Sequence, residues 1–540
     1  MAGLCLGYPA NEGHISQRLP PSLTRHRDRY QRPDFLALAA YDQQRAQRSP
    51  TPKEKQRAPE VFGYSEFYGW SEDKARHAHA REGSDFGKLV RGTVLASTRH
   101  PAASVGRRAA MYASIAQAVD ANWEHQVAWL KTLVGFPTLR GREAPCQDWL
   151  AREFSGRGWA VDRYALADVS MEHLPGYSPV MDTDYQQAIQ VVASLRAPEQ
   201  AGHSLILQGH VDVVPEGPPE MWTSAPYQPT VREGRLYGRG AGDMKAGVSA
   251  MVFALDAIRS AGYAPASDVY VQTVTEEECT GNGALSTLAR GYRADACLIP
   301  EPTRGAVLRG TIGVMWFRLK LRGRPVHVSE TERGTNAIMS AFALLQAIQD
   351  FTRDLNERVK EHPWFSRIDA PIKFNPGKIR GGDWASSTPA WCEVDCRIAV
   401  YPGTPLEAFR TELAAVVARA AEQDAFLVNS PPEIVWNGFQ ADDYVLEPGS
   451  EFENTVRASH RGITGADPDE RILPAVTDCR FYGRYYGIPS LAYGPSSSEG
   501  HGFDESVDLE SVKRTTLVIA EVISRWCGIR PGITPAPQSA

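Results

Sequence analysis

Long apolar runs and a strong excess of one charge are both missing from this 540-residue sequence. No stretch approaches the roughly 20 apolar residues that a membrane-spanning helix needs. Residues 1–13 contain no basic segment followed by an apolar run, which would indicate a signal peptide. The formal net charge is only −6, which argues against a large basic surface for nucleic acid or an anionic membrane. We therefore expect a cytoplasmic protein with a small-molecule substrate and neither a nucleic-acid nor a membrane partner.

Cysteine is also sparse, with eight residues scattered along the chain and no CxxC pair. This usage favours reduced thiols in a cytosolic protein over a disulfide scaffold. Cys392 and Cys396 lie an even number of residues apart, and hence on one face of an expected strand. Their simplest interpretation is as small buried residues.

The first 110 residues differ in texture from the rest of the chain. They are rich in Arg, His, Pro and Ser and show no long amphipathic period, so we expect an N-terminal extension that is largely irregular. An aromatic cluster at residues 62–70 is the exception and could pack as a small arm or interface. At the other end, the Pro- and Ser-rich residues 531–540 are expected to form a disordered tail.

Residues 111–311 alternate between helical and strand patterns. Apolar residues recur at helical spacing between Ile115 and Val134. Further helices are expected at 146–154, 246–260 and 283–289. Short apolar runs predict strands at 188–195, 204–207, 268–274 and 296–299. This alternation predicts an α/β domain with a mostly parallel central sheet and flanking helices.

Residues 312–428 show a different pattern of apolar and polar residues. This segment contains two alternating strand patterns and two amphipathic helices, expected at 314–321, 391–400, 337–351 and 406–421. They predict a small α+β sandwich inserted into the larger domain. The chain returns to the α/β pattern over residues 429–530, with a late strand at 489–493.

Acidic and imidazole side chains follow the expected strands or lie in glycine-rich loops. They are His210, Asp212, Asp243, the glutamates at 276–278, Glu301 and His501. In an open α/β sheet, ligands bind at the carboxyl ends of the strands. We therefore expect these segments to converge on one edge of the sheet.

These residue types suit a pair of divalent metal ions. Zinc takes imidazole nitrogen and carboxylate oxygen, and two metals that share a carboxylate and a water form a hydrolytic centre. The set supplies two histidines, one candidate bridging carboxylate, two further carboxylates and one acid left over as a general base. Asp212 can accept the second ring N–H of His210 and fix its tautomer.

Each of these signals is weak when taken singly. A Gly-His-x-Asp sequence is more often a turn, and a run of glutamates is more often a solvated face. Their order, their spacing and their shared position at strand ends favour the metal-centre interpretation.

Five motifs carry a family resemblance. They are LQGHVDVVP at 207–215, YGRGAGDMKAG at 237–247, TEE at 275–277, EPT at 301–303 and EGHGFDE at 499–505. Together they resemble the zinc-dependent amidohydrolases and exopeptidases that include acetylornithine deacetylase, succinyl-diaminopimelate desuccinylase, aminoacylase and glutamate carboxypeptidase. The resemblance covers roughly residues 115–527.

The resemblance implies two Zn²⁺ or Co²⁺ ions per subunit. The ligands that it implies are Asp243 as the bridge, His210 and Glu301 on one ion, and Glu277 and His501 on the other. Glu276 would be the general base on the bridging water, and Asp212 would orient His210. Residues 111–311 and 429–530 would form the catalytic domain, and residues 312–428 the lid, through which the family forms homodimers.

The lid carries a candidate catalytic histidine. The segments GRPVHVS at 323–329 and GTNAI at 334–338 correspond to the family's lid histidine and the helix after it. By resemblance, His327 would polarise the scissile carbonyl, often across a dimer interface. The alternative is a surface histidine without a catalytic role.

Arg397 and Asn375 are the candidate substrate-binding residues of the lid. By resemblance, Arg397 would bind the substrate carboxylate, and Asn375 lies where the family contacts its substrate. The alternative for Arg397 is a cross-strand pair with Glu393 or Asp395.

The sequence thus predicts a metal-dependent hydrolase that cleaves the amide bond of a small N-acylated amino acid or amine. One alternative is a dipeptidase or carboxypeptidase, and another is a deformylase of formylated aminopyrimidines, each with the same two-metal centre. A catalytically inactive binding or scaffold protein is the alternative from a different class. Residues 382–389 lack the asparagine that is common in the family before Val-Pro. This departure leaves undetermined which acyl group and which amine the substrate contains.

Overall fold

The computed structural model describes residues 101–532, with side chains from residue 110 onward. The chain divides into two compact units, Met1–Tyr112 and Ala113–Ala540, and nearly all described residues belong to the second. The expectations for residues 1–100 of the N-terminal extension, its aromatic cluster at 62–70 and the tail after residue 532 lie outside the described residues. Residues 101–110, expected to be irregular, instead begin a helix that runs over Pro101–Val134. Within the described part, no helix combines the length and the apolar character needed to cross a membrane.

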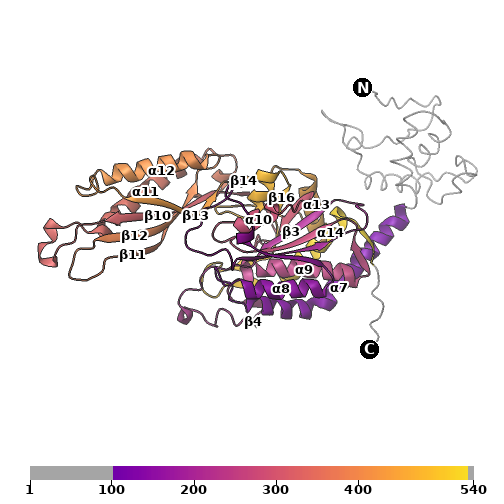
Figure 1. Ribbon diagram of the computed structural model, residues 1–540. Coiled ribbons are helices and arrows are strands. Elements are labelled where there is room, and N and C mark those ends of the chain that lie inside the picture. Colours follow the sequence, from indigo (N-terminus) through magenta and orange to yellow (C-terminus); the bar gives the residue numbers. More distant parts are fainter. Residues whose placement is uncertain (1–100, 533–540) are drawn as a thin grey trace, which may run out of the picture. The chain divides into compact units, whose positions relative to one another are not determined.

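A six-stranded sheet forms the centre of the catalytic domain, in the order β1-β2-β7-β3-β8-β16 (Figure 1). Its strands are β1 Ala160–Ala165, β2 Ile189–Leu195, β3 Leu205–His210, β7 Val269–Val274, β8 Ala296–Ile299 and β16 Ser490–Ala492. The neighbouring strands β7, β3, β8 and β16 pair in parallel. Strand β2 pairs antiparallel with both β1 and β7. The expected mostly parallel sheet is confirmed, with an antiparallel edge that the sequence pattern did not indicate.

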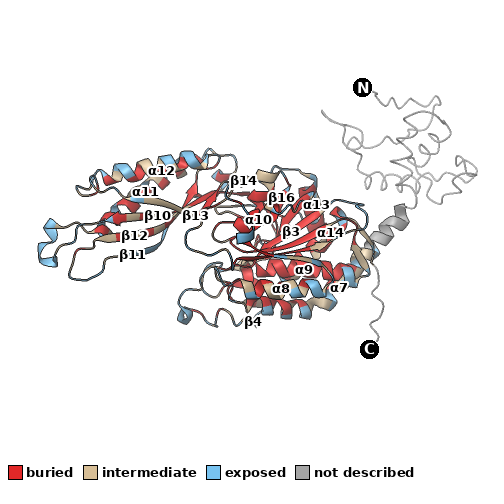
Figure 2. Ribbon diagram, viewed as in Figure 1, coloured by how far each residue is buried: buried red, intermediate tan, exposed pale blue. Residues whose placement is uncertain are grey.

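Helices cover both faces of this sheet, and β3 and β7 are therefore buried along their whole length. Ile206 of β3 joins a core cluster with Leu285 of α10, while its neighbours in the strand face the other side. The helices are α7 Pro101–Val134, α8 Ala144–Gly156, α9 Ala246–Ser260, α10 Asn282–Ala289, α13 Glu451–Thr464 and α14 Leu509–Trp526. Figure 2 shows that the inner strands of this sheet are almost entirely buried, whereas the edge strand β1 is partly exposed.

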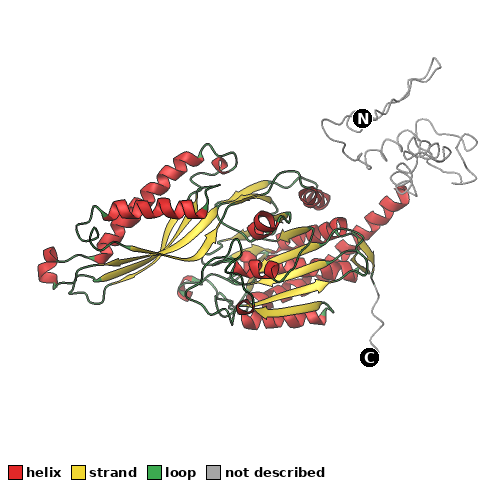
Figure 3. Ribbon diagram, turned by 45° about the horizontal axis from the view of Figure 1, so that its top comes forward, coloured by secondary structure: helices red, strands yellow, loops and turns green. Residues whose placement is uncertain are grey.

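The lid is a four-stranded antiparallel sheet with two helices packed on one face (Figure 3). Its elements are β10 Gly313–Arg322, α11 Ala337–Val359, β11 Phe374–Gly381, β12 Trp391–Val400, α12 Leu406–Ala421 and β13 Glu433–Ala441. The predicted α+β insertion is confirmed. Its predicted end at residue 428 is wrong, because β13 pairs with β10 and adds Phe439 and Ala441 to the lid core.

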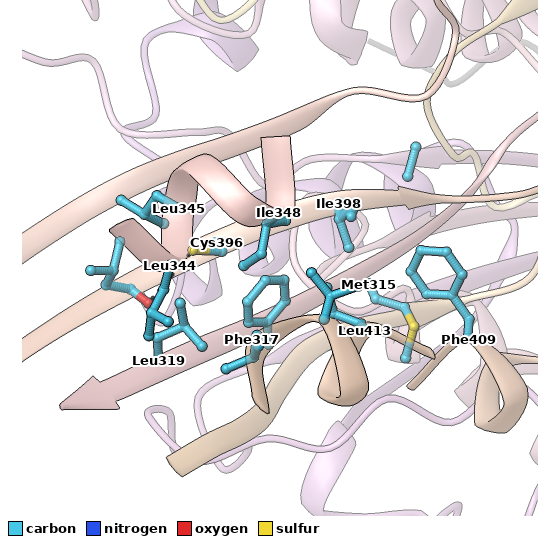
Figure 4. Close-up of a cluster of buried hydrophobic side chains, with 14 of the residues drawn as sticks. Met315, Phe317, Leu319, Leu344, Leu345, Ile348, Cys396, Ile398, Phe409 and Leu413 are labelled. Carbon is cyan, nitrogen blue, oxygen red and sulfur yellow. Dashed lines mark hydrogen bonds between the residues drawn. The ribbon is translucent and has the colours of Figure 1, made fainter. Parts of the chain in front are cut away.

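The lid core explains which face of its sheet is free. Met315, Phe317 and Leu319 of β10 lie under α11 and α12 (Figure 4). Trp316 alternates with them and lies on the opposite face. The Asn336 side chain caps α11 by accepting the N–H groups of residues 338 and 339 at 3.0 and 3.1 Å.

Three smaller sheets lie outside the central sheet and the lid sheet in the described residues. They are β9 Val307–Thr311 with β14 Tyr444–Val445 and β15 Glu470–Leu473, β5 Arg235–Tyr237 with β4 Thr230–Arg232, β18 Ser506–Asp508 and β17 Ser497–Ser498, and β6 Tyr263–Pro265 with β19 Ile529–Pro531. The seven cysteines in the described part of the chain are free thiols. Cys392 and Cys396 are both buried in the lid core, as predicted.

Candidate metal centre

His210 is the last residue of β3 and is 1% exposed. Its Nδ1–H donates to the main-chain carbonyl of Asp212 at 3.0 Å, which directs Nε2 toward Asp243 Oδ1, 3.2 Å away. In the neutral imidazole, this tautomer presents the Nε2 lone pair to a metal. The Asp212 carboxylate is 3.6 Å from Nδ1 and instead accepts the backbone N–H of Glu278 at 3.0 Å.

Asp243 lies between two histidines in the glycine-rich turn before α9. Its Oδ1 faces His210 Nε2 at 3.2 Å, and its Oδ2 faces His501 Nε2 at 3.6 Å. Although burial alone would raise the pKa of Asp243, hydrogen bonds to the two histidines lower it below its ordinary value. An ionised carboxylate with one oxygen toward each imidazole suits a bridge between two metal ions.

Glu505, which the sequence analysis did not single out, holds this turn in place. Its buried carboxylate accepts the backbone N–H groups of Gly240, Gly242 and Asp243 at 2.9, 2.8 and 3.0 Å, and it pairs with the buried Arg239 at 2.8 Å. Gly240 has a φ of 80°, which glycine adopts without a Cβ penalty. The loop of His501 thereby fixes the position of Asp243.

Glu276 points away from this cluster. Its φ of 70° turns the chain where β7 ends, and its carboxylate is held by Arg140 at 2.8 Å, the Tyr185 hydroxyl at 3.0 Å and the Thr280 hydroxyl at 2.9 Å. Glu276 is not among the residues that line the cavity of the site. This placement corrects the prediction that Glu276 faces the bridging water, because its carboxylate is already paired with a cation outside the cavity.

Glu277 and Glu278 both line the cavity. Glu278 Oε1 is 3.1 Å from His501 Nε2, and one ligand atom each from His210, Asp243 and Glu278 lie within 4.8 Å of one another. Glu277 Oε2 is 3.9 Å from His210 Nε2. The residue beside His501 is therefore Glu278 rather than the predicted Glu277. The turn at Glu276 moves the metal-facing positions of the three glutamates one residue further along the chain than predicted.

Glu301 completes the acidic wall, with its Oε1 4.0 Å from His210 Nε2. Burial, with the nearby charges of Asp243 and Asp478, raises the pKa of Glu301 well above its ordinary value. Asp478 is a second residue that the sequence analysis missed; it is fully buried and accepts a hydrogen bond from Gln208 at 2.7 Å. This crowding of carboxylates around two imidazoles gives a donor set that fits divalent metal ions.

A cavity of about 480 Å³ extends from these acids to the lid. Asn375, Arg397 and Trp316 lie directly opposite one another on β11, β12 and β10. Cross-strand partners share a face of the sheet, and all three residues line the cavity. The predicted substrate-binding residues are therefore brought together on the lid face that the helices leave free.

Arg397 has no carboxylate within 4.0 Å in the part of the chain that the structure describes. Its guanidinium donates only to the carbonyls of residues 373 and 474, at 3.4 and 3.2 Å, and burial lowers its pKa. The alternative cross-strand pair does not form, since Asp395 pairs with Arg318 and Glu393 with Arg380. The Arg397 guanidinium is thus available to an anionic ligand.

His327 is exposed and is not among the residues that line the cavity. Its Nδ1 accepts the backbone N–H of Ser329 at 3.2 Å. The structure of one chain therefore does not bring His327 to the metal centre.

Known proteins are similar to this chain in sequence and in fold. Residues 206–525 match peptidase family M20/M25/M40. The chain is 27% identical over 440 residues to N-formyl-4-amino-5-aminomethyl-2-methylpyrimidine deformylase of Bacillus subtilis (strain 168), with 77% of this chain and 97% of the relative covered. It is 26% identical over 394 residues to succinyl-diaminopimelate desuccinylase of Acidovorax ebreus (strain TPSY), with 71% and 93% covered.

Two solved structures with a similar fold are dipeptidases. Dug1p from Saccharomyces cerevisiae gives a TM-score of 0.62 at 14% identity, with 77% of this chain and 98% of that one covered. Human carnosine dipeptidase 1 gives 0.61 at 15% identity, with 77% and 99% covered.

The chain belongs to peptidase family M20/M25/M40. It is a hydrolase of this family that acts on amide bonds, as its curated relatives do. The predicted family, the α/β catalytic domain with an inserted lid domain, and the class of enzyme are confirmed. Divalent metal use follows from the family together with the donor set.

Proposed function

We propose that this chain hydrolyses the amide bond of a small N-acylated amino acid with two divalent ions, zinc or cobalt, in each subunit. The observation that carries the proposal is that Asp243 faces His210 with one oxygen and His501 with the other, in a cavity that also holds the unpaired Arg397. The ligands would be Asp243 on both ions, His210 and Glu301 on one, and Glu278 and His501 on the other.

Glu277 is our candidate for the general base. When bound, the two ions would bring the pKa of a shared water from 15.7 toward about 7. Glu277 lines the cavity and is the carboxylate left over once the ligands are assigned. It would take the proton of the attacking water and return it to the leaving nitrogen. Burial, with the charges of Asp478 and Glu301, raises the pKa of Glu277 well above its ordinary value, which favours proton uptake.

Arg397 supports a substrate with a carboxylate. A guanidinium binds a carboxylate through two parallel hydrogen bonds, and Asn375 beside it offers further donors. The formylated aminopyrimidine named for the Bacillus subtilis relative contains no carboxylate and would leave Arg397 unpaired. An N-acyl amino acid is therefore favoured over that substrate, and a dipeptide, which also ends in a carboxylate, is the second candidate.

The exposed apolar face of the lid supports a homodimer. Met339 and Phe342 on α11 and Ile379 on β11 are exposed, and β11 is an edge strand of the lid sheet. Exposed apolar patches and unpaired strand edges are common at protein interfaces. We propose that the lids pair in this region and that His327, which does not reach its own cavity, polarises the scissile carbonyl in the other subunit.

A hydrolysis screen tests the proposed function. Purified protein would be assayed for release of free amine from acetyl-, succinyl-, formyl- and aminoacyl-amides of amino acids and of simple amines, with zinc or cobalt supplied. We expect turnover of N-acyl amino acids that a chelator abolishes and added metal restores. Turnover restricted to amides without a carboxylate would contradict the proposal.

A further inference from the structure

We infer that Arg471 forms a second anion-binding subsite in the same cavity, so that the substrate carries two carboxylates. The inference rests on the proposed function and concerns which amides are accepted. Arg471 lies on β15 of the catalytic domain, and its side chain lines the cavity together with Glu301 and Arg397. No motif in the sequence pointed to this arginine.

Arg471 is a cation without an anionic partner. Its guanidinium makes one long hydrogen bond, to the carbonyl of Thr303 at 3.4 Å, and among the described residues no carboxylate lies within 4.0 Å of it. The residue is exposed overall, and partial burial of its guanidinium, together with the charge of Arg304, lowers its pKa. A guanidinium offers five N–H donors, so most of the hydrogen-bonding capacity of Arg471 faces the cavity or solvent.

The two free guanidiniums come from different domains. Arg397 projects from lid strand β12, in a row with Asn375 and Trp316. Arg471 comes from β15, which pairs with β9, and it touches the carbonyl of Thr303, two residues after Glu301. Two guanidiniums on the two domains can hold two carboxylates, one each, through parallel hydrogen bonds.

The charges of the cavity agree with a doubly negative substrate. Four carboxylates line it: Asp243, Glu277, Glu278 and Glu301. Their four negative charges balance those of the two divalent ions in the proposed centre. The guanidiniums of Arg397 and Arg471 then leave an excess of two positive charges, which a substrate with two carboxylates would neutralise. Such a substrate is an N-acyl amino acid whose acyl group or side chain ends in a second carboxylate.

Matched substrates test this inference on the zinc-loaded protein. One pair differs in the acyl group, N-succinyl-alanine against N-succinamoyl-alanine, and one in the side chain, N-acetylglutamate against N-acetylglutamine. In at least one pair, kcat/KM should be about 10- to 100-fold higher for the diacid, as expected for a charge-assisted hydrogen bond. The pair that shows the preference locates the second carboxylate. Equal kcat/KM within both pairs would overturn the inference.

Arg471→Gln and Arg304→Gln separate the subsite from general electrostatics. Arg471→Gln should reduce the diacid preference to about one, mainly through a higher KM for the diacid. Arg304 is the matched control, since it is an equally exposed arginine near Thr303 but does not line the cavity, and its variant should keep the preference. If Arg471→Gln lowers kcat/KM equally for both members of a pair, the subsite does not exist.

The failure of this inference is distinct from the failure of the proposed function. If metal-loaded protein hydrolyses members of both pairs without a charge preference, only the second subsite is refuted. If it hydrolyses no N-acyl amino acid of the panel, the proposed function is refuted, and the subsite with it.

Discussion

The three glutamates after β7 have different environments, and their amide variants should fail in different ways. Glu277→Gln keeps its shape but cannot accept a proton. We expect it to retain both metals while kcat falls by about 10² or more, the scale of general-base loss. Glu278→Gln removes a charged ligand beside His501, so it should lose one metal first and recover partly in excess zinc. Metal content and kcat, with and without added zinc, distinguish the two.

Glu276→Gln is the matched control for that pair. Because Glu276 is buried against Arg140, its variant should keep both metals but unfold at a lower temperature. If Glu276→Gln instead stays fully stable and loses activity as Glu277→Gln is expected to, the assignment of the base is reversed.

Proton competition at His501 should make zinc binding depend on pH. Glu278 and Asp243 raise the pKa of His501 to about 11, so at neutral pH the metal-free imidazole holds a proton that a metal must displace. The apparent zinc affinity should therefore rise with pH, by up to about tenfold per unit for each proton displaced. Competition with a chelator between about pH 6 and pH 8 measures this slope. An affinity that is flat or falls over this range would contradict the assignment of His501 as a ligand.

At the scale of elements, Glu505 joins the His501 loop to the turn before α9 through its bonds to that turn and to Arg239. This clamp should support both stability and metal binding. Glu505→Gln weakens the pair with the buried Arg239, and breaking a buried pair costs about 3 kcal/mol. We expect a lower free energy of unfolding and weaker zinc binding, because the Asp243 turn loses a charged partner. Glu499→Gln, an exposed change in the same loop, is the control. Equal effects of the two variants on denaturant unfolding would rule out the clamp.

Strongly periodic elements could be predicted from the sequence alone. The predicted bounds of α9, β8, β12 and α12 coincide with the observed ones, because apolar positions repeat there without interruption. Strand β11 was missed because it is mostly exposed and contains Pro376 and Gly377, so its residues do not alternate between apolar and polar. The end of the lid was placed too early for a related reason, since the first half of β13 is only partly buried.

The candidate site was predictable where its residues follow strands. His210 is the last residue of β3, and Glu301 follows its parallel neighbour β8, so the rule that ligands bind at the carboxyl ends of strands brings them together. Three adjacent glutamates cannot be told apart by composition, and only the positive φ of Glu276 decides their directions. Glu505 and Arg471 act through contacts distant in sequence, which no local pattern reveals.

At the scale of the whole molecule, a homodimer with His327 acting on the other subunit predicts complementation between inactive variants. In a mixture of His327→Ala and Glu277→Gln, each mixed dimer would contain one site with both residues intact. Random exchange should restore about a quarter of the wild-type activity. Sedimentation should show dimers, and each variant alone should stay inactive. A mixture that shows no recovery despite subunit exchange would contradict the action of His327 on the other subunit.

The two-metal centre is tested most directly by titrating zinc into chelator-stripped protein while the rate of amide hydrolysis and the bound metal are both measured. We predict no activity without metal and a rate that rises until about two equivalents of zinc are bound per chain, because Asp243 faces a histidine with each of its oxygens. Full activity in stripped protein, or saturation with a single equivalent, would contradict the two-metal centre.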